Sequence, residues 1–291
     1  MTQTRLYTVA GHTFSIELPA GNGIAAEMKQ YEPFAIDGSD GETVFRLTVA
    51  DDDSFLEGLT PTIEMNQDDD GSQIVAGNCG GKPYFEFQLW GKTAARMITN
   101  GTYTEGTAVL YDNALFGINN ALMVLYALST ADKQTALFHS SVVSYKGRGY
   151  MFLGISGTGK STHTGLWLRN IEGTQMVNDD NPVVRQTADG IKVFGSPWSG
   201  KTPCYRNVSY PLGALVQLSQ APHNAIRRLS PLEAYAALMP SISGKRWDAR
   251  VADGLHRMET TIISEIPMFH LECLPDADAA RVCCQAVACQ S

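Results

Sequence analysis

The sequence predicts a protein of mixed α and β structure, α/β or α+β with a mixed sheet, built from two domains. Three observations lead to this prediction: β-like runs dominate before Asp112, helix-like and β-like segments mix after it, and a glycine-rich segment joins a predicted strand to a predicted helix. The chain has 291 residues, of which 44% are hydrophobic, enough for one large core or two smaller ones. Two domains are therefore expected, residues 1–112 and 113–291.

The N-terminal domain is predicted to be rich in β-strands. Runs of β-branched and aromatic residues alternate there with clusters of Gly, Asp, Asn and Pro, which favour turns. The predicted strands are 5–10, 12–18, 43–49, 84–90 and 106–112. Because these runs carry no candidate catalytic cluster, we expect the domain to recognise a partner or substrate.

The second domain is predicted to combine a mixed sheet with helices. A first helix is expected from Asn113 to about Leu128, where apolar residues recur at helical spacing. Strand-like runs follow within 135–154, where a turn at 146–149 separates two of them, and at 174–180, 181–186, 191–195, 212–219, 225–230 and 267–274. Helix-like segments lie at 160–170, at 231–239, within 245–264 and at 276–290. In the last of these, Cys283 and Cys284 are expected to act as small apolar residues of the buried face.

Residues 154–162 read GISGTGKST and predict a phosphate-binding loop between a strand and a helix. The spacing Gly154-x-x-x-x-Gly159-Lys160-Ser161 matches the pattern in which backbone N–H groups surround the phosphates of ATP. Lys160 would offset the charge of the outer phosphates, and Ser161 would bind Mg²⁺, with Mn²⁺ as the alternative ion. The predicted nucleotide-binding residues are Gly154, Ser156, Gly157, Thr158, Gly159, Lys160, Ser161 and Thr162.

Asp179 and Asp180 end an apolar predicted strand that follows the loop and its helix. Phosphoryl transfer to an alcohol requires one carboxylate to hold the metal ion and another to accept the proton of the alcohol. Adjacent residues at a strand end point to different sides and could divide these two tasks. Taken alone, Asp-Asp-Asn more often forms a solvated turn, but its place after a phosphate-binding loop favours a site.

Two further cations, Lys201 and Arg206, lie in the irregular stretch FGSPWSGKTPCYRN at 194–207. Either could reach a transferring phosphoryl group and stabilise its charge. The competing interpretation is a structural loop in which both side chains are solvated. Composition alone favours neither interpretation.

The phosphate-binding loop and the Asp pair occur together with the stretch HSSVV at 139–143. With GRGYMFLGISGTGKST at 147–162 and NDDNPVV at 178–184, roughly the last 180 residues resemble the HPr kinase/phosphorylase and phosphoenolpyruvate carboxykinase superfamily. The resemblance implies a kinase-type domain with a phosphate-binding loop. It also implies that Asp179 takes the hydroxyl proton, Asp180 holds the metal, and His139 lies beside the reacting phosphate or a second metal. The roles of the two Asp residues could be exchanged, and His139 alone would more often be a half-buried histidine.

The expected function is that of a kinase-like enzyme dependent on Mg²⁺ and ATP. It would transfer the γ-phosphoryl group to a hydroxyl of a protein, a peptide or a small molecule. Two alternatives stay open: an ATP-binding regulator that performs no transfer, and a shortened carboxykinase. NDDNPVV lacks the His that follows the Asp pair in carboxykinases, and we find no counterpart of the C-terminal signature of HPr kinases. Decarboxylation and phosphorylation of HPr itself are therefore not implied.

Charge and hydropathy limit the remaining partners. The net charge is −8 and the sequence contains no run of Lys and Arg, so a nucleic-acid partner is not expected. The most apolar stretch, Ala121 to Leu128, is much shorter than the ~20 residues of a membrane span, so no membrane association is expected. The N-terminus lacks the features of a secretory leader, which predicts a cytoplasmic protein. Self-association into a homo-oligomer is compatible with these features.

Overall fold

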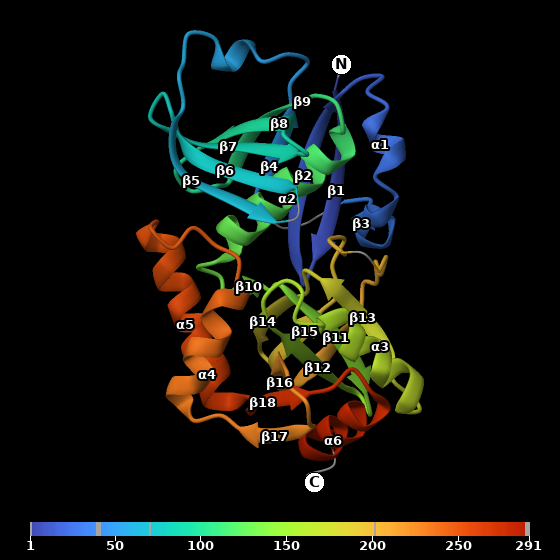
Figure 1. The fold of residues 1–291 in the computed structure, drawn as a ribbon. Helices are drawn as coiled ribbons and strands as arrows, with labels where there is room; N and C mark the ends of the chain where they lie inside the picture. Colours follow the sequence, from blue (N-terminus) through green and yellow to red (C-terminus); the bar gives the residue numbers. More distant parts are fainter. Residues whose placement is uncertain (1, 39–41, 70, 201, 289–291) are drawn as a thin grey trace. The chain divides into compact units, whose positions relative to one another are not determined.

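The computed structural model describes residues 2–38, 42–69, 71–200 and 202–288. The chain divides into two compact units, Met1–Thr130 and Ala131–Ser291 (Figure 1). Each unit contains helices and a mixed sheet, which confirms the predicted class of mixed α and β structure. Among the described residues, no helix combines the length and the apolar composition that crossing a membrane requires.

The first unit is built on a nine-stranded sheet in the order β3-β1-β2-β4-β9-β8-β7-β6-β5. Its strands are β1 Thr2–Val9, β2 His12–Pro19, β3 Ala35–Ile36, β4 Arg46–Val49, β5 Thr62–Asp69, β6 Ser72–Cys79, β7 Lys82–Leu89, β8 Lys92–Thr99 and β9 Glu105–Leu110. Strand β4 pairs in parallel with β2 and β9, and the other pairs are antiparallel. Short helical segments α1 Ile24–Glu27, η1 Lys29–Phe34 and η2 Ser54–Leu56 lie between strands.

Helix α2, Ala114–Thr130, belongs to the first unit and packs on β7, β8 and β9. The Tyr126 hydroxyl donates a hydrogen bond of 3.0 Å to the Val9 carbonyl of β1. Gly117 lets α2 pack closely on β8, because a Cβ at this position would lie 2.6 Å from the Ala94 carbonyl oxygen of that strand. The boundary between the units therefore falls after Thr130, whereas the sequence placed this helix in the second domain.

The second unit contains a sheet in the order β10-β14-β15-β16-β12-β11-β13; β18 also pairs with β16, and β17 pairs with the other edge of β18. Its strands are β10 Thr135–Leu137, β11 Ser140–Tyr145, β12 Arg148–Leu153, β13 Gln175–Asp180, β14 Val183–Thr187, β15 Gly190–Phe194, β16 Ser209–Gln220, β17 Ala225–Arg228 and β18 Met268–Cys273. Strand β16 runs parallel to β12 and β18, and the other pairs are antiparallel. This is the mixed sheet that the sequence predicts.

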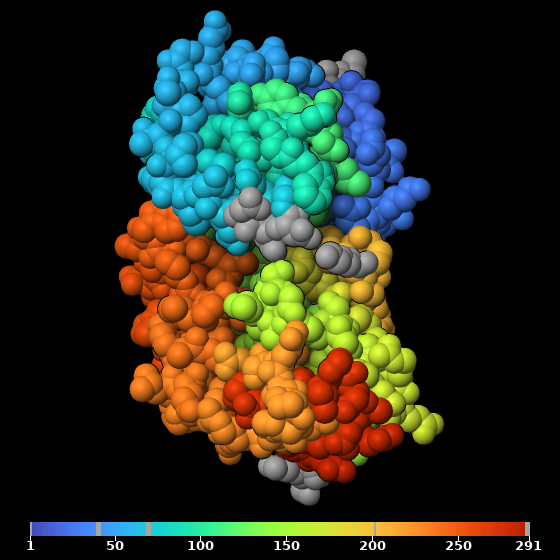
Figure 2. Space-filling view, in the orientation of Figure 1, coloured from blue at the N-terminus to red at the C-terminus, as the bar shows by residue number. Residues whose placement is uncertain are grey.

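The helices of the second unit are α3 Lys160–Asn170, α4 Pro231–Leu238, η3 Met239–Ser241, α5 Ala249–Glu265 and α6 Ala277–Ala288. Helices α3 and α6 contact each other, and the red atoms of α6 lie beside the yellow-green atoms of α3 in Figure 2. Between them and the sheet lies a core that includes Phe152, Trp167, Val216 and Leu271. Cys283 and Cys284 are buried in this core, as predicted. In this core Phe152 of β12 packs against Trp167 of α3, with ring centroids 5.6 Å apart.

Candidate functional site

The glycine-rich segment connects the end of β12 directly to the first residue of α3, so the predicted strand, loop and helix are confirmed. Gly157 and Gly159 have φ angles of 81° and 104°, in the left-handed region that side chains other than Gly rarely adopt. The first hydrogen bond of the helix runs from His163 N to Gly159 O, at 2.9 Å. The N–H groups of Ser161 and Thr162 precede that bond, at the end of the helix that favours anions.

Short contacts hold the loop in a defined shape. The Thr158 backbone N–H donates to the Ile155 carbonyl at 3.2 Å, and the Thr158 hydroxyl donates to the same oxygen at 2.5 Å. The Gln220 side chain at the end of β16 donates to the Gly157 carbonyl at 3.3 Å. Ser156 and Thr162 are exposed, so the described loop presents backbone and hydroxyl groups to solvent.

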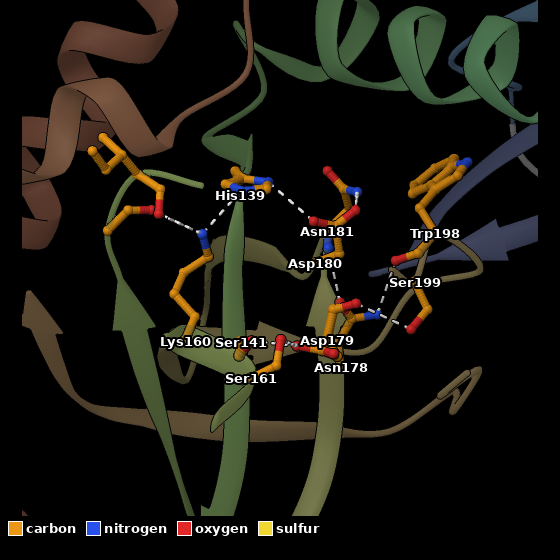
Figure 3. Close-up of polar contacts among 12 residues, drawn as sticks. His139, Ser141, Lys160, Ser161, Asn178, Asp179, Asp180, Asn181, Trp198 and Ser199 are labelled. Atoms are coloured by element: carbon orange, nitrogen blue, oxygen red, sulfur yellow. Dashed lines mark hydrogen bonds and ion pairs between the residues drawn. The ribbon is translucent and has the colours of Figure 1, made fainter. Parts of the chain in front are cut away.

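Lys160 lies at the centre of the site, and its residue is only 9% exposed. Its ammonium nitrogen Nζ is 2.8 Å from the Gly154 carbonyl oxygen and 3.0 Å from His139 Nε2 (Figure 3). A longer contact of 3.4 Å reaches the Ile155 carbonyl. The ammonium group is thus enclosed by acceptors of the chain itself, and a phosphate oxygen would be a stronger acceptor in their place.

His139 lies between β10 and β11 and joins Lys160 to Asp180. An ammonium group can only donate, so His139 Nε2 accepts from Lys160 and the ring proton resides on Nδ1. His139 Nδ1 lies 3.0 Å from Asp180 Oδ1 and therefore donates to it. The side chains of His139 and Asp180 are 36% and 33% exposed, so solvent or a ligand can reach both.

Asp179 is nearly buried, with 2% of the residue exposed. Its carboxylate oxygen Oδ1 accepts a hydrogen bond from the Ser161 hydroxyl at 3.0 Å and another from the Ser141 hydroxyl of β11. The serine predicted to bind Mg²⁺ thus contacts Asp179, while Asp180 contacts His139. We use the name Asp cluster for the residues His139, Ser141, Lys160, Ser161, Asp179 and Asp180.

The backbone at the end of β13 is held in an unusual conformation. Asp180 has a φ of 123°, which a residue with a side chain rarely adopts and which costs on the order of 1–3 kcal/mol. The Asn178 side chain accepts from Asn181 N at 2.9 Å and donates to the Trp198 carbonyl at 3.2 Å. The Asn181 side chain donates to Asp180 Oδ2 at 2.7 Å. These contacts turn the chain so that Asp179 and Asp180 face different partners.

A glycine lets the following loop approach the Asp pair. Gly200 N donates to the Asp179 carbonyl at 2.6 Å, and a Cβ at Gly200 would lie 3.0 Å from the Asp180 Cβ. The Ser199 hydroxyl also donates to the Asp179 carbonyl, at 3.1 Å. Ser199 and Gly200 therefore support the site through a small side chain and the backbone.

The structure does not bring Arg206 to the Asp cluster. Its guanidinium donates to the Met176 carbonyl and to the Gln175 side chain, near the start of β13. Asp180 lies four residues beyond Met176 along this strand, about 13 Å from it at the usual rise of a strand. The interpretation of Arg206 as a structural residue of the loop is thus the better one. Lys201, the other predicted cation, lies outside the described residues.

The oxygen atoms of the Asp cluster suit a hard cation such as Mg²⁺. Within the described ranges, no group of three or more His, Cys, Asp and Glu side chains could hold a metal ion by itself. Mg²⁺ commonly uses one or two protein carboxylates and takes its other ligands from phosphates and water. Ser161, Asp179 and Asp180 are the residues that could contribute the protein ligands.

Sequence reasoning missed the residues that hold the Asp pair in place. Ser141, Asn178 and Ser196 are buried and bind the pair or the turn that follows it. For Asn178 a signal existed, because a polar residue directly before the Asp pair in an apolar strand is unusual. Ser141 could be found only from the register of β11 and β13, which places it opposite Asp179.

No protein-family model matches this sequence, and no curated protein matches it significantly. The function is therefore inferred from the geometry. The decisive feature is that Lys160, His139 and both Asp side chains, which come from three segments of the chain, meet at the end of the glycine-rich loop.

Proposed function

We propose that this protein is a kinase-like phosphotransferase that depends on ATP and Mg²⁺ and transfers the γ-phosphoryl group to a hydroxyl group. The observation that carries the proposal is the Asp cluster directly beside the glycine-rich loop. A loop alone would suit any protein that binds a nucleotide. Two carboxylates and a histidine at the same place add groups that can accept a proton from an alcohol. The resemblance to HPr kinases supports the same assignment.

Binding of the nucleotide would use the loop and the start of α3. The N–H groups of Ser161 and Thr162, at the positive end of the helix dipole, would donate to phosphate oxygens. Lys160 would exchange its contacts with Gly154 O and His139 for the outer phosphates. Its ammonium group already lies at the loop, 2.8 Å from the Gly154 carbonyl oxygen, so the phosphates would bind beside it.

Mg²⁺ would neutralise part of the phosphate charge when it is bound. Ser161 and one Asp carboxylate would contribute protein ligands to it. In the structure Ser161 already lies beside Asp179, so these two groups can approach one ion together.

In the transfer step, the acceptor oxygen forms a bond to the γ-phosphorus while the bond from that phosphorus to the bridging oxygen breaks, which releases ADP. The hydroxyl proton moves to a carboxylate of the Asp pair. The resemblance assigns the proton to Asp179 and the metal to Asp180. The structure also offers the exchanged assignment, since Asp180 is the more exposed carboxylate and Asp179 contacts Ser161.

The test is transfer of labelled γ-phosphate from ATP into a lysate of the native organism, comparing wild type with Asp179→Asn and Asp180→Asn. We expect wild type to give a labelled product that is lost in both variants. The variant that retains Mg-ATP binding identifies the Asp residue that acts as the base. Asp189→Asn is the matched control, because Asp189 is an exposed carboxylate that pairs with Lys192 in a turn.

The outcome also decides between catalysis and regulation. If wild type binds ATP but neither transfers phosphate nor hydrolyses ATP, the protein is a nucleotide-regulated switch. The contacts of Lys160 with His139 favour this second candidate, because a bound nucleotide would release His139 and change the contacts at Asp180.

A further inference from the structure

Ser141 lies in the stretch HSSVV, in which the sequence predicts a role for His139 but none for Ser141. It lies on β11 directly opposite Asp179 of β13, and the two residues form a cross-strand pair. Ser141 is 1% exposed, and its hydroxyl donates a hydrogen bond to Asp179 Oδ1 (Figure 3). A buried carboxylate oxygen therefore has a donor that comes from the sheet and not from the loop.

Asp179 Oδ1 has a second donor, Ser161, whose partner would change during the reaction. Ser161 belongs to the start of α3 and is the residue expected to bind Mg²⁺. If its oxygen bound the ion, its hydrogen bond to Asp179 would be weakened or redirected. Ser141 has no comparable role at the phosphates, because it is held within the strand pairing of β11 with β12 and β13.

We propose that Ser141 is a positioning residue that fixes the Asp179 carboxylate during phosphoryl transfer. Its hydrogen bond occupies Oδ1 and directs the other carboxylate oxygen toward the reacting groups. This inference rests on the proposed kinase function. It holds for either role of Asp179, since a base and a metal ligand both need a fixed orientation.

The neighbouring residue supplies a matched control. Ser140 is 0% exposed and lies opposite Asp180 in the same pair of strands, but adjacent side chains of a strand point to opposite faces. Among the described residues, no hydrogen-bond partner is found for the Ser140 hydroxyl. Ser140→Ala therefore removes a buried hydroxyl next to the site without removing a contact to Asp179.

The experiment compares wild type, Ser141→Ala, Ser141→Thr and Ser140→Ala in transfer of γ-phosphate to the acceptor found in the lysate. We expect Ser141→Ala to lower kcat on the order of tenfold, because a hydrogen bond to a charged group is lost. The Kd for Mg-ATP, measured by calorimetry, should change less than about twofold, since the loop contacts are untouched. Ser141→Thr keeps the hydroxyl and should restore kcat to within about threefold of wild type. Ser140→Ala should transfer at the wild-type rate.

Thermal unfolding of each variant separates positioning from stability. If Ser141→Ala does not fold, Ser141→Cys keeps the side-chain volume, replaces O–H by the weak S–H donor, and should show the same loss in kcat. Equal kcat for wild type and a folded Ser141→Ala or Ser141→Cys would overturn the role of Ser141 alone. An equal loss of kcat in Ser140→Ala would also overturn it. Absence of any transfer by wild type would overturn the kinase function and this inference together.

Discussion

The two units each contain a carboxylate surrounded by hydrogen-bond donors, but the surroundings differ in kind. In the first unit, Glu86 lies within β7 and accepts from Tyr84 at 2.6 Å, Gln88 at 2.7 Å, Thr93 at 2.8 Å and Arg96 at 3.0 Å. All five residues belong to two adjacent strands, β7 and β8. In the second unit, the Asp cluster draws its members from several elements that meet at the ends of strands.

The difference separates a carboxylate that stabilises a sheet from carboxylates placed for chemistry. Burial disfavours the charge of Glu86, but its hydrogen bonds and the Arg96 guanidinium outweigh this and hold its pKa below the ordinary value. Burial and the bond to Glu86 raise the pKa of Tyr84. The Asp cluster instead combines a left-handed backbone at Asp180, a glycine loop and side chains that would change partners when a ligand binds. We expect substitutions at Glu86 and its donors to change the free energy of unfolding. Substitutions in the Asp cluster should instead change nucleotide binding or phosphoryl transfer.

The largest effect is expected from Lys160→Ala. The variant loses the one ammonium group placed at the end of the loop among the described residues, so Mg-ATP affinity should fall by at least on the order of 100-fold. Calorimetric titration measures the affinity. Lys192→Ala, which removes a lysine paired with Asp189 on a turn, is the control and should bind as wild type does. Unchanged affinity in Lys160→Ala would remove the basis for a phosphate-binding loop.

Glu86→Gln should lower stability and leave Mg-ATP binding unchanged, the reverse of the effect expected from Lys160→Ala. An amide cannot accept from all four donors, so the free energy of unfolding of the first unit should fall by about 2 kcal/mol. Mg-ATP affinity should stay the same. Urea unfolding and calorimetry measure the two quantities, with the exposed Glu105→Gln as the control. A variant of full stability that has lost nucleotide binding would show that the distinction between the two carboxylate groups is wrong.

Burial of His163 behind the loop predicts a dependence of stability on pH. The ring packs against Phe152 and accepts from Trp167, and burial lowers the pKa of His163 from 6.5 to about 4. Between these values the unfolded chain binds the proton and the folded chain does not, so stability falls as the pH falls through this window. From pH 7 to pH 5 the loss attributable to His163 is about 2 kcal/mol.

The prediction is tested by comparing wild type with His163→Gln, which keeps an acceptor for Trp167. Other groups also titrate between pH 7 and pH 5, so the informative quantity is the difference between the two proteins. The variant should lose about 2 kcal/mol less than wild type over this range, measured by chemical unfolding at each pH. Equal losses of stability in both proteins would show that His163 takes up its proton in the folded state over the same pH range as in the unfolded chain.

Local patterns in the sequence were sufficient for the loop and for most strands of the second unit. The hairpin of β11 and β12 followed from its turn at Lys146 and Gly147, both of which have positive φ angles. The Asp pair was placed correctly at the end of a strand. These features depend on residues close together in the sequence, where spacing and turn chemistry carry the information.

Features that depend on distant pairing were not predictable. Strand β5 reads TIEMNQDD, and its polar composition at the edge of the sheet hides the alternation that marks a strand. Helix α2 is apolar over most of its surface, so its pattern could not show which unit it joins. The contact between Ser141 and Asp179 requires the register of two strands, and a shift of one residue would place Ser140 there instead.

The smallest effect is expected from Gln220→Ala, which tests whether an exposed contact shapes the loop. Gln220 ends β16, is exposed, and donates to Gly157 O at 3.3 Å. An exposed hydrogen bond of this length contributes roughly 0.5 kcal/mol, so Mg-ATP affinity should fall about two- to threefold. Calorimetry measures the change, with Gln67→Ala on the exposed edge strand β5 as the matched control. The loop should keep its shape because Thr158 binds Ile155 twice and both glycines retain their conformations. A loss of 30-fold or more would mean that the end of β16 holds the loop open for phosphate, and that binding depends on the sheet as much as on Lys160.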